Sequence, residues 1–338
     1  MTSSDSLSPA FAEGHPKVSV IVANFNGAHL LPDCLGSLVT QDYRPLEVIV
    51  ADNGSADESQ QVAARFPVSF LALGRNYGLS GANNRGAEAA RGDLLLFFNN
   101  DMRFDATCVS ALVAALVAAG DAAFAADALQ YDWAGNRIIH GRGYLERGNF
   151  VTSLLPGIGL RYENQCQAPA DVPWGNTANL LVWADKFRSL EGFDESLFID
   201  WEDVDLCWRA ALRGWRTIFV PDAHVFHRVA ASYEGVSREM RRHRLLSQER
   251  NKQRFLLKTM PPSLLATFLL QQILRVAGYA LRGSPRQSAV ILQAFWQNLG
   301  QLPFLLSQRR SILQNSSVAS ADLLHRFVTT GTALAASP

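Results

Sequence analysis

The stretch that decides the fold is Gly92-Asp93-Leu94-Leu95-Leu96-Phe97-Phe98-Asn99-Asn100-Asp101. Residues 94–98 form a short apolar run without helical spacing, which predicts a strand buried on both faces. The run ends abruptly in two amides and a carboxylate. Ligands of open parallel sheets bind where strands reach their carboxyl ends. This polar end is therefore a candidate for holding a metal and a phosphorylated ligand.

Upstream of this run, buried-type strands alternate with helices. Strands are predicted over residues 18–23, 46–51 and 68–73, helices over residues 28–40 and 56–66, and a glycine-rich turn (74–81) leads into a helix to residue 90. The alternation predicts βαβ units, a parallel sheet and right-handed crossovers. Polar side chains follow three strands, at Asn24 and Asn26, at Asp52 and Asn53, and at Asn99 to Asp101. We expect these clusters to converge on one edge of the sheet.

The downstream half is less regular. Helices are predicted over residues 107–119 and 202–213, the second with an Asp205–Arg209 ion pair on one face, and residues 120–175 predict short strands and a variable loop. Residues 264–281 and 289–306 are strongly apolar, but glutamines, an arginine and a proline interrupt them. Neither run predicts a clean membrane-spanning helix. Amphipathic helices in a membrane interface are favoured, with a helical subdomain packed on the core as the alternative.

Charge is unevenly distributed along a chain whose formal net charge is zero. Residues 1–230 contain 17 Lys and Arg against 27 Asp and Glu, a balance of −10, whereas residues 231–338 contain 14 against 4, a balance of +10. This asymmetry favours an acidic, cation-using catalytic part and a basic region facing an anionic surface, with two solvated faces as the alternative. The four cysteines lack zinc-knuckle and redox spacing, so free thiols in a reducing cytosol are expected. Residues 1–16 predict a disordered tail, not a signal peptide.

The glycine-rich segment argues against two kinds of nucleotide chemistry. It contains neither the G-x-G-x-x-G fingerprint nor the G-x-x-x-x-G-K-[ST] phosphate loop, which disfavours hydride transfer and ATP hydrolysis. A glycine-rich helix start, here around Gly78, can still host a diphosphate. Asp52 precedes a Gly-Ser turn and can accept an N–H from a base ring. An ordinary turn or helix start is the alternative for Asp52.

Three acidic positions suggest further chemistry. A hard cation such as Mg²⁺ or Mn²⁺ often takes only one or two carboxylates, so Asp101 is a candidate ligand, with His227 as a second ligand or a structural histidine. Glu202 and Asp203 follow aromatic residues, including Trp201. Desolvation there raises a carboxylate's pKa toward that of a general base. A helix N-terminus, where acids offset the helix dipole, is the alternative.

In this order, the motifs resemble glycosyltransferase family 2 of the GT-A fold, especially its bacterial rhamnosyltransferase-like branch. The similar segments are residues 18–27, 50–57, 76–86, 99–101, 192–209, 221–227 and 249–252. The set is specific for the superfamily and not for the sugar. Glu191 stands where the family commonly has glycine, and residues 174–179 depart from its usual Ser-Gly-Ala, which suggests a specialised acceptor-side loop.

The resemblance implies an α/β GT-A fold, with a mostly parallel central sheet flanked by helices, and an inverting glycosyltransferase. The donor would be dTDP-rhamnose or a UDP-sugar, and the acceptor a hydroxyl of a glycan or polyprenyl-linked molecule in cell-surface polysaccharide synthesis. Asp203 is implied as the catalytic base with Glu202 beside it, and Asp101 and His227 as ligands of Mg²⁺ or Mn²⁺. The implied donor-binding residues are Asn24, Asn26, Asp52, Asn53, Asn76, Gly78, Asn83, Asn99 and Asn100. The implied acceptor-side residues are Trp174, Gly175, Asn176 and Trp201.

The predicted organisation is a disordered tail (1–16), a GT-A domain (17–258), a helical amphipathic segment (259–315) and a C-terminal tail (316–338). The amphipathic segment would make peripheral membrane contact or pack as a subdomain, which places the enzyme in the cytoplasm at the inner face of the membrane. No nucleic-acid partner is expected. One alternative is a sugar-phosphate nucleotidyltransferase, which would want a basic loop after the first strand, whereas residues 24–27 contain no Lys or Arg. Another is a non-catalytic nucleotide-sugar-binding module, which would be expected to lose Asp101 or Asp203.

Overall fold

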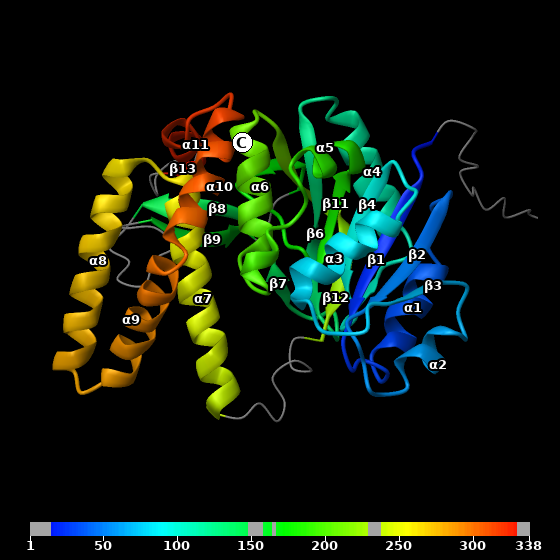
Figure 1. Cartoon of the computed structure of the whole chain (residues 1–338). Helices are drawn as coiled ribbons and strands as arrows, with labels where there is room; N and C mark the ends of the chain where they lie inside the picture. Colours follow the sequence, from blue (N-terminus) through cyan, green and yellow to red (C-terminus); the bar gives the residue numbers. More distant parts are fainter. Residues whose placement is uncertain (1–14, 148–157, 164–166, 229–237, 330–338) are drawn as a thin grey trace, which may run out of the picture.

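The computed structural model describes residues 15–147, 158–163, 167–228 and 238–329, and centres on a mixed sheet between layers of helices (Figure 1). Its strands are β1 (Val18–Asn24), β2 (Leu46–Asp52), β3 (Ser69–Ala72), β4 (Leu94–Asn99), β5 (Met102–Phe104), β6 (Ala123–Asp132), β7 (Ile138–His140), β10 (Ala170–Val172), β11 (Asn179–Trp183) and β12 (Arg216–His227). A separate small sheet holds β8 (Arg142–Arg147), β9 (Ile158–Glu163) and β13 (Val328–Thr329).

The helices fall into two groups along the chain. Those of the first part are α1 (Leu31–Val39), α2 (Ser59–Ala63), α3 (Gly78–Ala89), α4 (Cys108–Ala118), α5 (Ala184–Ser189), the 3-10 turn η1 (Glu195–Leu197) and α6 (Glu202–Leu212). Those of the second part are α7 (Arg238–Thr259), α8 (Pro262–Leu281), α9 (Pro285–Leu299), α10 (Leu302–Gln314) and α11 (Ser320–Phe327). In Figure 1, α8 and α9 lie on the side of the molecule opposite β3.

The main sheet has the strand order β10-β12-β6-β11-β4-β1-β2-β3. The run from β4 to β3 is parallel, as the alternation of strands and helices predicted. β11 is antiparallel to both β4 and β6, whereas β6 and β12 are parallel. The parallel half therefore brings the carboxyl ends of β4, β1 and β2 to one edge.

The centre of the sheet is buried on both faces, and β4 is apolar at every position from Leu94 to Phe98. Along β4, Leu95 and Phe97 belong to one core cluster and Leu94, Leu96 and Phe98 to the other. Helices α3, α5, α6 and α7 supply side chains to the first cluster, and α1 and α4 to the second. Such continuous apolar runs are typical of parallel strands with helices on both faces.

Several elements differ from the sequence-based predictions. α3 begins at Gly78, inside the stretch predicted as a turn, and α2 is only five residues long. Residues 120–175 contain the ten-residue core strand β6, because its alanines fill a crowded interior and packing overrides their low strand propensity. The apolar run 289–306 is two helices that part at Gly300, with Pro303 in the first turn of α10, where a missing N–H is tolerated.

The C-terminal part returns to the sheet domain. The backbone N–H groups of Ser317 and Val318 donate to the carbonyl of Leu212, and Leu323 of α11 is in the core. Cys34, Cys108 and Cys207 are buried free thiols, while Cys166 and residues 1–14 lie outside the described residues. α8 is long and apolar enough to cross a membrane by length and composition. One of its polar interruptions, Arg275, pairs with Glu249 of α7 at 2.6 Å.

Candidate active site

The polar ends of β1, β2 and β4 meet at one edge, as predicted. Asn24 is the register partner of Asp52, and Asn99 is the partner of Ala23. Asn24 Nδ2 donates to Asp52 Oδ1 at 2.8 Å, and Asn100 Nδ2 donates to Asn24 Oδ1 at 2.7 Å. A chain of side-chain hydrogen bonds thus joins all three strand ends.

Asp52 is buried and already bound by its own turn. Its carboxylate accepts the Ser55 N–H at 2.9 Å and the Ser55 hydroxyl at 2.6 Å, in addition to the Asn24 amide. Asn26 is exposed, and its side chain accepts the Ala56 N–H at 2.9 Å. The two predicted donor-binding residues therefore also shape the loops after β1 and β2, and Asp52 keeps limited free lone-pair capacity for a base.

The start of α3 is fixed to the end of β2. Asn53 Nδ2 donates to the Gly78 carbonyl at 3.0 Å, its Oδ1 accepts the Tyr77 N–H at 3.1 Å, and Asn76 Oδ1 accepts the Gly78 N–H at 2.8 Å. Gly78 has φ +76°, and a Cβ there would lie 2.4 Å from the carbonyl oxygen of Phe198. Only glycine tolerates both the positive φ and the close contact with Phe198. The backbone of the predicted diphosphate-binding turn is therefore fixed against Phe198.

Replacing Gly78 by alanine is expected to destabilise the protein by about 2–4 kcal/mol, because backbone strain and a backbone clash add. Gly74→Ala is the matched control: Gly74 has φ +77°, but nothing lies within 4 Å of its added Cβ. The control should lose only about 1 kcal/mol, the cost of the left-handed conformation. Thermal unfolding measures both variants. Equal losses of stability in the two variants would show that the contact with Phe198 does not destabilise Gly78→Ala.

Asp101 and His227 come together from β4 and β12. Asp101 lies between β4 and β5, is 7% exposed, and its Oδ2 is 3.3 Å from His227 Nε2. Adjacent ligands of one octahedral ion with bonds of about 2.1 Å lie roughly 3 Å apart, so this oxygen and nitrogen fit one hard cation. Within the described ranges no cluster of three or more His, Cys, Asp or Glu forms a metal site. Substrate phosphates and water would have to complete the shell.

Glu202 and Asp203 occupy the first turn of α6. Glu202 is 4% exposed and Asp203 is half-buried. Burial raises the pKa of Asp203 to about 6, although the Val204 and Thr177 N–H groups and nearby His140 oppose the rise. Burial, and then the charge of Asp203, raise the pKa of Glu202 to about 8. Burial raises the pKa of both acids, and the charge of Asp203 further opposes the ionisation of Glu202, so the pair resists carrying two negative charges at neutral pH.

Asp127 and His140 form a buried ionisable pair near Asp203 that the sequence analysis missed. His140 Nε2 lies 3.0 Å from Asp127 Oδ2, and Asp127 Oδ1 accepts the Asn176 N–H at 3.1 Å. The charge of His140 lowers the pKa of Asp203, and the charge of Asp127 raises it. The only signal in the sequence was one carboxylate within the apolar run of β6.

The predicted acceptor-side residues have unequal surroundings. Trp174 is buried in the core, and a Cβ on Gly175 would lie 2.8 Å from the Asp127 side chain. Asn176 Oδ1 accepts the Ala178 N–H at 3.0 Å, and the Ala178 carbonyl accepts the N–H of Asn99 at 3.3 Å. Residues 174–178 thus connect the end of β4 with the acid pair of α6.

Two other predicted residues face the interior. Asn83 lies on the buried side of α3 and is 1% exposed, with its Oδ1 lacking a hydrogen-bond partner among the described residues. Trp201 packs against Phe255 of α7, with ring centroids 5.6 Å apart. Asn83 and Trp201 therefore contribute to the packing of α3 and of the turn before α6.

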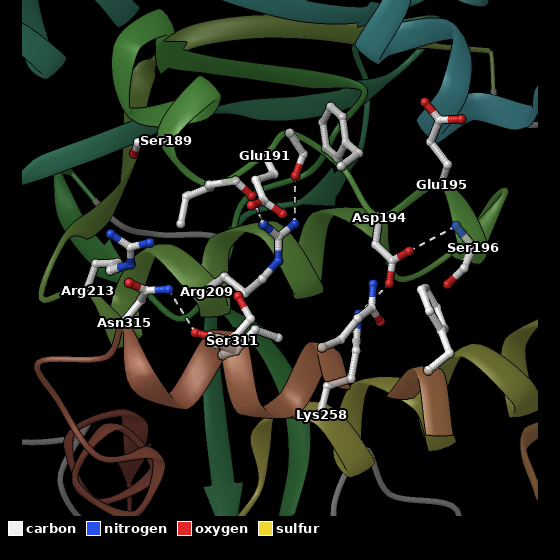
Figure 2. Close-up of a pocket in the computed structure, with 16 residues that line it drawn as sticks. Ser189, Glu191, Asp194, Glu195, Ser196, Arg209, Arg213, Lys258, Ser311 and Asn315 are labelled. Carbon is white, nitrogen blue, oxygen red and sulfur yellow. Dashed lines mark hydrogen bonds and ion pairs between the residues drawn. The ribbon is translucent and has the colours of Figure 1, made fainter. Parts of the chain in front are cut away.

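A cavity of about 360 Å³ lies away from this edge, between residues 189–196, α6, α7 and α10 (Figure 2). None of the predicted site residues lines it. Lys258 Nζ lies 2.6 Å from Asp194 Oδ2 and 2.6 Å from Asp205 Oδ1. Burial alone would raise the pKa of Asp194, but the Lys258 ammonium lowers it to about 2. The Lys258–Asp194 ion pair lines this cavity, and Lys258 also joins α7 to α6 through Asp205, so the strand edge remains the candidate site.

Comparison with known proteins points to one family. A sequence model described as "Glycosyl transferase family 2" matches residues 19–171. The N-acetylglucosaminyl-diphospho-decaprenol L-rhamnosyltransferase of Mycobacterium tuberculosis is 30% identical over 234 residues, which cover 63% of this chain and 76% of that protein.

Solved structures agree with the fold. GalNAc-T7 with UDP, GalNAc and Mn²⁺ has a TM-score of 0.57 at 17% identity, over 74% of this chain and 49% of its own. A mannosyltransferase from Pyrobaculum calidifontis in complex with GDP-Man and Mn²⁺ has a TM-score of 0.52 at 17% identity, over 89% and 86%. At this identity the likeness shows the fold alone, and it confirms the predicted GT-A architecture.

Proposed function

The chain belongs to glycosyl transferase family 2, and from this premise we propose that it is a metal-dependent, inverting enzyme of cell-surface polysaccharide synthesis. The proposed donor is a nucleotide-diphosphate sugar, dTDP-rhamnose or a UDP-sugar. The proposed acceptor is a hydroxyl of a glycan or polyprenyl-linked molecule. The rhamnosyltransferase relative, whose name specifies a diphospho-decaprenol acceptor, supports a lipid-linked substrate.

The donor would lie along the edge formed by β1, β2 and β4. Asp52 would accept an N–H of the base with the capacity that Ser55 and Asn24 leave on its carboxylate. The turn before α3, which Asn53 fixes and where Phe198 fills the space beside Gly78, would lie next to the diphosphate. Asn99 and Asn100 would contact the donor between these two groups.

Asp101 and His227 would hold a divalent cation together with the donor's phosphates. Bound there, Mg²⁺ or Mn²⁺ would supply positive charge that stabilises the departing diphosphate. The Mn²⁺ in the two solved relatives supports this assignment. With only two protein ligands, we expect weak cation binding alone and tighter binding once the nucleotide is present.

Asp203 would act as the general base. It would take the proton of the acceptor hydroxyl as that oxygen bonds to the anomeric carbon and the bond to the diphosphate breaks. Attack from the face opposite the leaving group inverts the carbon, and no covalent enzyme intermediate is needed. Burial and the charge of Asp203 raise the pKa of Glu202, which disfavours a second negative charge beside the base.

The observation that carries this proposal is the meeting of three groups at one sheet edge. The Asn24–Asp52–Asn100 chain, the Asp101–His227 pair and the Glu202–Asp203 turn come from distant parts of the sequence. A non-catalytic binding module has no need for an acid whose pKa burial raises toward neutrality.

The direct test is a panel of dTDP- and UDP-sugars incubated with the protein, Mg²⁺ or Mn²⁺, and polyprenyl-linked or glycan acceptors. We expect consumption of one donor, stimulation by the metal, and a product whose anomeric configuration, read by NMR, is opposite to that of the donor. No donor consumed with metal present would exclude the enzymatic function. A retained configuration would exclude the single-displacement mechanism, and formation of a nucleotide-sugar from a sugar phosphate would favour the nucleotidyltransferase.

We also propose that α8 and α9 contact the inner face of the cytoplasmic membrane. Their large exposed apolar residues are Leu269, Leu270, Ile273, Leu274, Leu281, Leu292, Phe295, Trp296 and Leu299. Arg282 and Arg286, at the turn between the helices, are exposed and basic. Apolar insertion combined with attraction to anionic lipid is the physics of interfacial helices.

The combined variant Leu270→Ser, Ile273→Ser and Trp296→Ser is expected to lower binding to anionic vesicles by at least about tenfold, because three side chains that are 57%, 65% and 65% exposed lose their apolar surface. Vesicle sedimentation measures binding. Val117→Ser is the control, since Val117 is 48% exposed on the other part of the chain. Activity on a water-soluble acceptor should persist. Unchanged vesicle binding of the triple variant would contradict this contact.

A further inference from the structure

The turn that leads into α6 has an unusual backbone. Phe198, Asp200 and Trp201 have φ of +63°, +68° and +76°, although none of them is glycine. L residues rarely adopt this region, and such conformations persist only where surrounding structure enforces them. Strained residues often gather at functional sites, where contacts from other elements hold them in place.

One amide from α7 holds the turn. Asn251 is fully buried, and its Nδ2 lies 2.7 Å from the Leu197 carbonyl, 2.9 Å from that of Ile199 and 2.9 Å from that of Asp200. Two N–H groups thus share three carbonyl oxygens. Arg250 Nε donates to Asn251 Oδ1 at 3.1 Å, which fixes the direction of the amide.

The turn connects the two halves of the proposed site. On one side the Phe198 carbonyl accepts the Ser80 N–H of α3 at 3.3 Å, next to Gly78. On the other side the turn ends at Trp201, whose carbonyl accepts the Asp205 N–H at 2.9 Å. Asp203 lies two residues further, in the first turn of α6. The direction of its carboxylate therefore depends on the path of the backbone through residues 198–201.

The same face of α7 contacts α6 and the turn over several helical turns. Arg244, Ser247, Asn251, Phe255 and Lys258 follow the spacing of one helix face. Arg244 pairs with Asp200 at 3.5 Å, and the Phe255 ring packs on Trp201 and Trp208. Lys258 bridges Asp194 and Asp205, and Figure 2 shows its contact with Asp194. Asn251 is thus anchored between an ion pair and a buried aromatic cluster.

We propose that Asn251 is a positioning residue, whose amide holds the strained turn 198–201 and thereby sets where Asp203 meets the acceptor hydroxyl. It does not touch the reacting atoms. The inference rests on the proposed role of Asp203 as the base. A displaced base mainly slows the chemical step, whereas the amide of Asn251 bonds to the carbonyls of residues 197, 199 and 200 and not to the donor-binding ends of β1, β2 and β4.

Asn251→Ala is expected to lower kcat by about 10- to 100-fold and to change the KM for the donor by less than about threefold. Asn298→Ala is the matched control. Asn298 is also a buried amide and bonds to α7 through the Arg250 carbonyl, Gln253 and Arg254, but it makes no contact with the turn. It should lower the melting temperature comparably and leave kcat within about twofold of wild type.

Relieving the backbone strain at residue 200 gives a second measurement of kcat, which would not change if Asn251 only stabilised the fold. Glycine adopts positive φ without strain, so Asp200→Gly should recover part of the kcat lost in Asn251→Ala and recover none in Asn298→Ala. If Asn251→Ala does not fold, Asn251→Ser, which keeps one donor, replaces it in the same comparison. Asp203→Asn is measured alongside to test the base assignment separately.

The outcomes separate the two claims. An active Asp203→Asn overturns the base assignment and the inference with it. An inactive Asp203→Asn combined with equal kcat values for Asn251→Ala and Asn298→Ala overturns only the role of Asn251. A selective loss of kcat in Asn251→Ala, partly restored by Asp200→Gly, supports it.

Discussion

Asp203→Asn is expected to slow sugar transfer by about 100- to 10,000-fold while nucleotide binding remains nearly intact. The substitution keeps the shape of the side chain but removes its ability to take a proton. Asp203 lies in the first turn of α6, and the donor contacts lie on β1, β2 and β4, so the two functions are separable. Initial rates with the identified donor, and titration of the free nucleotide, measure the two effects.

The same assignment predicts the pH profile. A base works only when deprotonated, and burial raises the pKa of Asp203 to about 6. The rate should therefore fall as pH drops through about 6, well above the range of an ordinary aspartate. Asp222→Asn, an exposed position on β12, is the control and should keep the wild-type rate and profile. Full activity in Asp203→Asn would remove the base assignment.

Asp101→Asn is expected to lower activity by about 100- to 1,000-fold and to abolish the tightening of nucleotide binding by Mn²⁺, because the proposed site has a single carboxylate. In the wild-type protein, Mn²⁺ should strengthen binding of the nucleoside diphosphate. Calorimetric titration of the nucleotide with and without Mn²⁺ measures this coupling directly.

Asp105→Asn is the matched control for this variant. Asp105 lies just after β5 and bonds to the Thr107 hydroxyl and N–H, contacts that asparagine can also make. His227→Gln should give a partial loss, since Asp101 would remain. If Asp101→Asn keeps the Mn²⁺-dependent gain in nucleotide affinity, the cation is held elsewhere.

Local pattern was enough to predict the parallel half of the fold. Residues 94–98 are apolar at every position, and only a strand buried on both faces accommodates such a short run. Parallel strands place their carboxyl ends on one edge, so Asn24, Asp52 and Asn99 had to meet once the alternation with helices was recognised. Short strands were predicted within residues 120–175, but the ten-residue length of β6 was not, because its alanines are poor strand formers and packing decides its conformation.

The candidate site, like the fold, could be predicted from the sequence only in part. The sequence placed Asp101 at the polar end of a strand and Glu202 and Asp203 after aromatic residues, but it left structural alternatives open for His227 and for the acid pair. The tertiary structure adds the geometry on which the proposed roles rest: β12 brings His227 within 3.3 Å of Asp101, and burial among distant segments raises the pKa of Asp203. Asp127 and His140 gave almost no signal because their pairing depends on the register of β6 with β7.

By itself, the sequence determined the order of the strands along the chain, the polar residues at their ends and the family. These features depend on neighbours within a few positions, which fix secondary structure and motif spacing. Only the tertiary structure decided how the acid pair is desolvated and what holds the strained turn before it. Those properties depend on desolvation and on hydrogen bonds from α7, roughly 50 residues away in sequence, and no local pattern encodes them.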